Sequence, residues 1–143
     1  GDEMILWDGS CIVHENFDVS VIKEYRKKYP NMMVMAHSEC PSEIIENVDF
    51  MGSTSDMLAQ IKNTSAESYM LVTECGLGEL ATTMFPDKKF IAMCRLCPYM
   101  KMTSLENVLE TLKNLPSNNE VILSKDLIER SRKSIDMMFE LAR

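Results

Sequence analysis

Residues 32–41 read MMVMAHSECP, and this stretch decides the fold class. Met32 to Ala36 form a short continuous apolar run, which is typical of a strand buried on both faces of a parallel sheet. A polar elbow, His37 to Pro41, follows directly, and a brief helix is predicted over 42–47. Because ligands of open α/β sheets bind beyond the carboxyl ends of the strands, the elbow is also a candidate binding region.

The same alternation of strand and helix extends along the chain on either side of this stretch. A helix capped by Asp18 and closed by Pro30 precedes it. Further strands are predicted at 49–51, 69–72 and 90–93, with an elbow at 73–78 and helices after Gly52 and over 79–85. Strands separated by helices of this length predict the α/β class, a three-layer αβα unit with a short parallel sheet.

The last part of the chain has a different pattern. An amphipathic helix is predicted over 104–115, a strand over 120–123 and a helix from Ser124 to Leu141. A boundary is therefore expected near Pro98, followed by a C-terminal helical segment.

Composition excludes several classes of protein. The chain has 15 Lys and Arg against 22 Asp and Glu, a net charge of −7, which argues against a nucleic-acid partner. No apolar run approaches about 18 residues, so no membrane span is expected. The five cysteines and the lack of an export signal are interpreted as reduced thiols of a cytoplasmic protein.

Polar and reactive residues gather at the predicted strand ends. His37 and Glu39 have the spacing of a general acid/base pair, and Gly52-Ser53-Thr54 opens a helix in the manner of an anion site. Cys94-x-x-Cys97 has metal or redox spacing, with Cys11 and His14 ahead of the first helix. Each feature also has a structural interpretation: a helix cap, a satisfied histidine, or a buried cysteine.

Taken together, these segments resemble quinolinate synthase, the iron–sulfur enzyme family of de novo NAD biosynthesis. The resemblance covers practically the whole chain, in the family's order and spacing. The matching stretches are WDGSCIVH (7–14), YP (29–30), AHSECP (36–41), GSTS (52–55), TECGL (73–77), FPDKKF (85–90) and CRLCPYMKM (94–102).

The resemblance implies a transferase that condenses iminoaspartate with dihydroxyacetone phosphate to quinolinate, phosphate and water. It implies three αβα domains around a [4Fe-4S] cluster held by one cysteine from each. Cys11 and Cys97 match two of these ligands, whereas spacing alone would also nominate Cys94. The remaining matches are His37, Ser38 and Glu39 for the substrate segment, with Glu39 as acid/base, Ser53 and Thr54 for the carboxylate-binding turn, and His14 facing the same cavity.

Two departures from the family pattern matter. Ser38 stands where the family usually has proline, and the sequence matches only the C-terminal half of the family's chains. The expected division is 1–11 as the end of a preceding domain, 12–97 as the αβα domain, and 98–143 as a segment that packs on the missing N-terminal domain. The alternatives are an inactive fragment or binding module that needs a partner chain, and a Cys94–Cys97 redox protein.

Overall fold

The computed structural model describes residues 8–115 and 119–142, except for the side chains of residues 92 and 94. The chain divides into two compact units, Gly1–Lys101 and Met102–Arg143. Each unit is described by itself, and the predicted division into 1–11, 12–97 and 98–143 stays a prediction.

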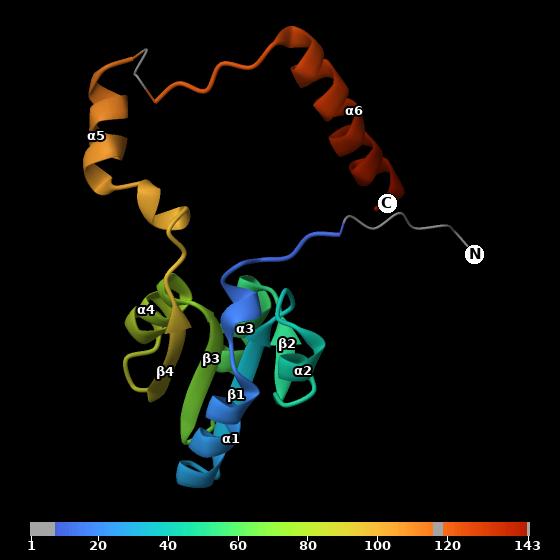
Figure 1. Ribbon diagram of the computed structural model, residues 1–143. Helices are drawn as coiled ribbons and strands as arrows, with labels where there is room; N and C mark the ends of the chain where they lie inside the picture. Colours follow the sequence, from blue (N-terminus) through green and yellow to red (C-terminus); the bar gives the residue numbers. More distant parts are fainter. Residues whose placement is uncertain (1–7, 116–118, 143) are drawn as a thin grey trace. The chain divides into compact units, whose positions relative to one another are not determined.

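The first unit is built on a four-stranded sheet (Figure 1). Its strands stand in the order β2-β1-β3-β4, and all three pairings are parallel. The strands are β1 (Met32–His37), β2 (Phe50–Gly52), β3 (Ser68–Glu74) and β4 (Phe90–Arg95). The strand predicted from Met32 to Ala36 is thus confirmed and lies inside the sheet.

Helices precede, connect and follow these strands. The elements are the 3₁₀ turn η1 (His14–Asn16), α1 (Val19–Lys28), α2 (Ser42–Ile45), α3 (Thr54–Asn63), α4 (Cys75–Met84) and the 3₁₀ turn η2 (Met100–Met102). Three of them, α1, α3 and α4, begin at residues whose side chains cap them. Asp18 accepts a hydrogen bond from the Ser20 amide at the start of α1. Ser53 and Asp56 form a reciprocal capping box at the start of α3.

Apolar side chains fill both faces of the sheet. Met32, Val34 and Ala36 face a core shared with α1 and α2, while Met35 faces a core shared with α3 and α4. All seven residues of β3 are buried. Two helical layers therefore enclose one parallel sheet, which confirms the predicted three-layer α/β class.

The structure corrects two predictions of secondary structure. The predicted elbow at 73–78 is wrong, because β3 continues to Glu74 and α4 begins at Cys75. The predicted strand over 120–123 is also wrong. That segment carries no strand pairing among the described residues, and Val121 and Ile122 are exposed. A strand needs a neighbouring backbone to bond, and no described residue provides one for this segment.

The second unit consists of α5 (Leu105–Lys113) and α6 (Lys125–Leu141), each capped by a serine. The predicted C-terminal helical segment is therefore confirmed. None of its described residues is buried, and apolar side chains such as Leu105 and Phe139 are exposed. No helix in the described part of the chain has the length and apolar character needed to cross a membrane.

Candidate functional site

A cavity of about 360 Å³ opens at the carboxyl ends of the strands. Five segments that are distant in the sequence supply its lining. Its polar and thiol-bearing residues are Cys11, His14, His37, Glu39, Thr54, Thr73, Glu74 and Cys97. The parallel sheet explains this convergence, because all its strands end at the same edge.

His14 is buried in this cavity, with 6% of its surface exposed. Its Nε2 lies 3.2 Å from the Thr73 hydroxyl, and its ring stacks on that of His37 at 4.7 Å between centroids. Burial lowers the pKa of His14, and the neighbouring His37 lowers it further, whereas the Glu39 carboxylate opposes the shift. His14 is therefore predominantly neutral at pH 7.

Glu39 lies between the two histidines. Its Oε2 is 3.1 Å from Nδ1 of His14 and 3.7 Å from Nδ1 of His37. The contact with His14 is close but lacks hydrogen-bond alignment, so that buried Nδ1 has no hydrogen-bond partner. The Glu39 amide donates to Nδ1 of His37 at 3.3 Å, which leaves Nε2 as the protonated nitrogen of a neutral His37.

The cysteines differ in state and exposure. Cys11 and Cys97 are free, half-buried thiols, and Cys40 is free and buried. Cys75 is disulfide-bonded, so the interpretation of every cysteine as reduced was wrong for that residue. Sequence spacing does not reveal which sulfurs meet in space. The side chain of Cys94 lies outside the described part, so its place in the rival ligand set stays untested.

Glu74 was missed by sequence reasoning, although it holds the Cys97 segment in place. Its side chain is buried at the end of β3, and its Oε1 accepts a hydrogen bond from the Cys97 amide at 3.4 Å. Its Oε2 accepts from the Gly76 amide at 2.6 Å, and the Lys101 ammonium lies 3.8 Å from Oε1. The only signal in the sequence was an acidic residue directly before a helix, a weak one for a glutamate.

Two predicted site residues do not line the cavity. The Ser53 hydroxyl donates to the Asp56 carboxylate at 2.6 Å and caps α3. The Ser38 amide donates to the Gly52 carbonyl at 3.1 Å, which continues the β1–β2 pairing by one bond. A proline at this position would lack that donor, so the bond compensates in part for the rigidity that serine lacks.

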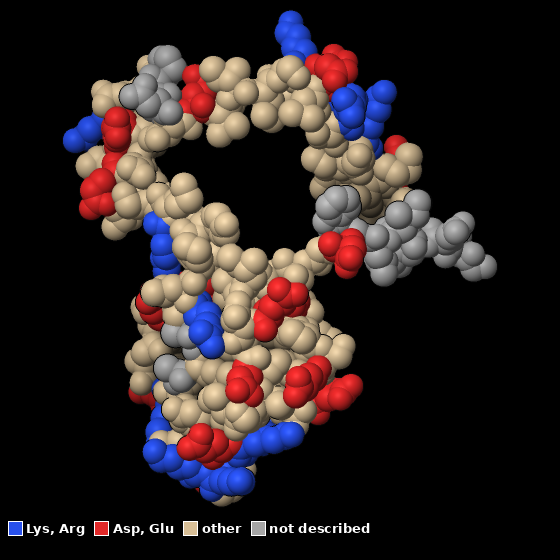
Figure 2. Space-filling view, viewed as in Figure 1, with Lys and Arg blue, Asp and Glu red and all other residues tan. Residues whose placement is uncertain are grey.

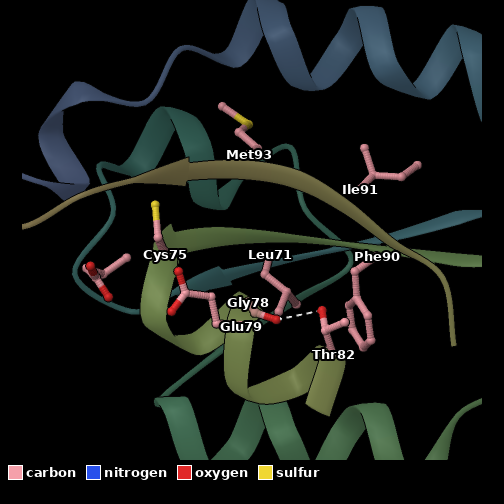
Figure 3. A pocket seen from close by; sticks show the side chains of 9 residues that line it. Leu71, Cys75, Gly78, Glu79, Thr82, Phe90, Ile91 and Met93 are labelled. Atoms are coloured by element: carbon pink, nitrogen blue, oxygen red, sulfur yellow. Dashed lines mark hydrogen bonds between the residues drawn. The ribbon is translucent and has the colours of Figure 1, made fainter. Parts of the chain in front are cut away.

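A larger cavity of about 440 Å³ lies between α4 and β4 (Figure 3). Its walls are mainly apolar, with Leu71, Phe90 and Ile91 among them. The Thr82 hydroxyl is engaged within α4, where it donates to the Gly78 carbonyl at 2.8 Å. No histidine lines this cavity, so the smaller one is the better candidate for a functional site.

Comparison with known proteins gives a consistent result. The family model described as "Quinolinate synthetase A protein" matches residues 1–140. A quinolinate synthase from Agrobacterium fabrum is 34% identical over 139 residues, which cover 97% of this chain and 40% of the relative. One from Cyanophora paradoxa is 30% identical over 149 residues, covering 99% of this chain and 45% of the relative. The chain thus spans less than half the length of the relatives it matches.

Proposed function

This chain belongs to the quinolinate synthetase A family, and from that premise we propose that it forms part of a quinolinate synthase. The whole enzyme would condense iminoaspartate with dihydroxyacetone phosphate to quinolinate, phosphate and water. One observation carries the proposal: Cys11 and Cys97, from opposite ends of the first unit's sequence, line a single cavity with two histidines and a glutamate.

The donor set fits the cofactor that the family resemblance implies. Cys11 and Cys97 are free thiols of intermediate exposure that line the same cavity. A [4Fe-4S] cluster bound by both residues needs free thiols in a shared cavity. The third thiolate would come from the remainder of the enzyme. A cluster with an open iron position supplies a Lewis acid for an oxygen leaving as water.

The chain's own polar residues divide the remaining work. We assign Glu39 as the acid/base because it is exposed to the cavity and lies within 3.7 Å of both histidine Nδ1 atoms. His14 and His37 orient that carboxylate and substrate oxygens. Ser38 contributes its backbone to the same segment.

The start of α3 is the proposed place for a substrate carboxylate. Thr54 lines the cavity at the first residue of that helix, where amide groups and the helix dipole favour an anion. Ser53 supports this turn through its capping bonds, since its hydroxyl is already engaged with Asp56.

Anion capture must be local, because the chain carries a net charge of −7. Basic side chains gather at the end of the first unit where α1 lies (Figure 2). Arg26, Lys27 and Lys28 form the last turn of that helix, which leads into the amino end of β1. These basic side chains therefore lie at the opposite end of the sheet from the cavity. Helix termini and hydrogen bonds in the cavity attract the anionic substrate groups instead.

Anaerobic iron–sulfur reconstitution tests the ligand assignment. The chain is prepared together with the part of a relative that it does not cover, and iron, sulfide and quinolinate formation are measured. Cys11→Ser and Cys97→Ser are each expected to remove the cluster absorbance and the activity, while Cys94→Ser retains both. Loss of the cluster in Cys94→Ser as well as in Cys11→Ser and Cys97→Ser would instead support the rival ligand set of Cys11, Cys94 and Cys97.

A second variant tests the carboxylate site. Thr54→Val in the same assembly is expected to weaken dicarboxylate binding by about 10-fold to 150-fold, because a charge-assisted hydrogen bond contributes roughly 1.5–3 kcal/mol. Ser55→Ala is the matched control, since this neighbouring hydroxyl is exposed and does not line the cavity. Equal affinity in Thr54→Val and the wild type, measured by calorimetry, would refute this placement.

The alternative is that the chain acts alone as a binding module without turnover. The chain covers about 40% of the length of the Agrobacterium fabrum relative. Ligand binding by this chain alone, with no activity gained on adding the remainder of a relative, would support that alternative.

A further inference from the structure

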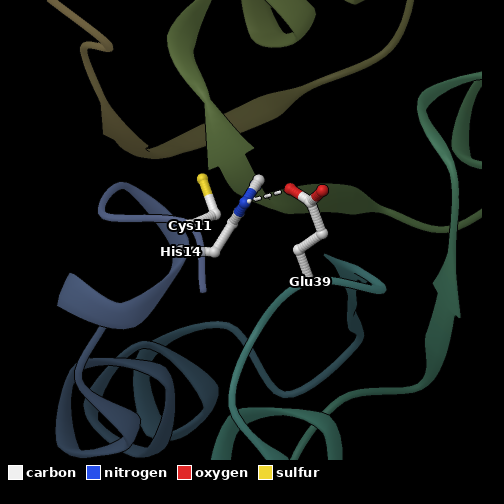
Figure 4. Close-up of side chains that lie close together, drawn as sticks. All are labelled: Cys11, His14 and Glu39. Atoms are coloured by element: carbon white, nitrogen blue, oxygen red, sulfur yellow. Dashed lines mark ion pairs between the residues drawn. The ribbon is translucent and has the colours of Figure 1, made fainter. Parts of the chain in front are cut away.

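We propose that Cys11, His14 and Glu39 form a site for a single zinc-type divalent cation. The cation binds there when Cys11 does not ligate an iron–sulfur cluster. The three side chains come from the segment before η1, from η1 itself and from the turn after β1. Figure 4 shows the sulfur, the ring nitrogen and the carboxylate turned toward one space. Cation binding here does not depend on the proposed function; only the competition with a cluster does.

Geometry supports a mononuclear site. One potential ligand atom from each of the three residues lies within 4.8 Å of the other two. Tetrahedral zinc with bonds of about 2.0–2.3 Å holds its ligand atoms roughly 3.3–3.8 Å apart. The required contraction is small, and the Glu39 side chain is 58% exposed and able to supply it.

The state of His14 is an independent indication of a missing ligand. Its Nδ1 is buried in a residue that is only 6% exposed, and its contact with the Glu39 carboxylate at 3.1 Å does not satisfy it with an aligned hydrogen bond. Buried polar nitrogens are normally satisfied, so this atom points to an absent partner. A cation between Nδ1, the thiolate and the carboxylate would satisfy it.

The second nitrogen of His14 suits the same role. Metal-bound histidines usually engage the other ring nitrogen in a hydrogen bond that fixes the ring, and here Nε2 lies 3.2 Å from the Thr73 hydroxyl. Cysteine, histidine and glutamate leave a fourth position open, as in three-ligand zinc sites.

Cobalt(II) is a direct spectroscopic probe for this site. The complete chain, reduced and freed of metal by a chelator under argon, is titrated with Co²⁺ and then with Zn²⁺. One equivalent of Co²⁺ is expected to give a thiolate-to-cobalt charge-transfer band and the intense visible bands of tetrahedral cobalt. One equivalent of Zn²⁺ is then expected to abolish both.

Variants identify the ligands. Cys11→Ser is expected to remove the charge-transfer band and weaken binding about 100-fold, with Glu39→Gln weakening it while keeping the band. Cys97→Ser is the matched control, because this thiol lines the same cavity but stands outside the three-residue group. It should bind Co²⁺ as the wild type does, and circular dichroism establishes that each variant is folded.

The outcomes separate this inference from the proposed function. Absence of any band, an unchanged band in Cys11→Ser, or equal loss in Cys97→Ser would overturn the cation site. Cobalt binding through Cys11 in a chain that assembles no cluster even with the remainder of a relative added would support the cation site and count against the proposed function alone. Slower cluster formation in the zinc-loaded protein would support both.

Discussion

Burial separates the free cysteines into two kinds at the scale of single residues. Cys40 is 7% exposed, and its thiol donates to the Val72 carbonyl at 3.6 Å. Burial raises the pKa of Cys40 to about 11, with smaller contributions from Cys11 and Glu39. Its thiol therefore stays protonated under conditions in which a thiolate ligand is needed, which supports its exclusion from the metal-binding set.

The raised pKa predicts how stability depends on pH. Below the ordinary thiol pKa of 9.0, both folded and unfolded chains hold the Cys40 proton, and no pH dependence arises from it. Between pH 9 and 11 the unfolded chain loses this proton while the folded chain keeps it, so stability falls as pH rises. Relative to Cys40→Ala, the wild type should lose about 1–2 kcal/mol between pH 8 and 10.5.

Urea denaturation of both proteins at several pH values measures this difference. The comparison between variant and wild type removes the contributions of other groups that titrate in the same range. A difference in unfolding free energy that stays constant from pH 8 to 10.5 would contradict the prediction.

The sequence indicates which residues gather at the candidate site better than it indicates which of their side chains contact one another. Strand ends place His37, Glu39, Thr54 and Cys97 at one edge, because parallel strands share a direction. The stacking of His14 on His37 and the role of Glu74 depend on side-chain packing between segments distant in the chain. Neither contact has a signature in the local sequence, so only the three-dimensional structure reveals them.

The start of α4 shows how one element supports the site. Glu74 caps this helix through the Gly76 amide and also accepts from the Cys97 amide. A Cβ at Gly76 would lie 2.8 Å from the Glu74 carboxylate, so glycine permits this close approach. An elbow was predicted over 73–78, but the cap and the apolar face of α4 outweigh the low helix propensity of Gly76 and Gly78.

Two alanine substitutions in α4 are therefore expected to act in opposite directions. Gly76→Ala displaces the carboxylate and should destabilise the chain by about 1–2 kcal/mol through weakened hydrogen bonds. Gly78→Ala meets no atom within 4 Å and should stabilise it by up to about 1 kcal/mol through helix propensity. Urea denaturation measures both, and a stabilised Gly76→Ala would contradict the role given to the Glu74 cap.

The prediction of a strand over 120–123 was wrong because of missing strand pairing in the described chain, not because of low strand propensity. Its apolar residues have a strand-like composition, yet a strand forms only where another backbone bonds to it. Val121 and Ile122 are more than 80% exposed in the described chain. A sequence pattern reports the preference of a segment and not the presence of its neighbour.

At the scale of the whole molecule, the two units differ in how their apolar residues are used. The first unit contains two buried clusters, one on each face of its sheet. In the second unit no described residue is buried, and the apolar faces of α5 and α6 are exposed. The first unit should therefore contribute most of the free energy of unfolding of the described chain. The exposed apolar faces of α5 and α6 agree with the expectation that this segment packs on the remainder of the enzyme.

Hydrogen exchange tests this division directly. Amides of β3 are expected to exchange only through global unfolding of the first unit. Amides of α5 and α6 should exchange within seconds, because unpacked helices of 9 and 17 residues are marginal in water. A chain ending at Lys101 should consequently unfold at the same urea concentration as the full chain. Adding the part of a relative that this chain does not cover should then slow exchange in α5 and α6 and leave β3 unchanged. Protection of α6 equal to that of β3 in the chain alone would contradict this division, since it would require a packing partner within these 143 residues.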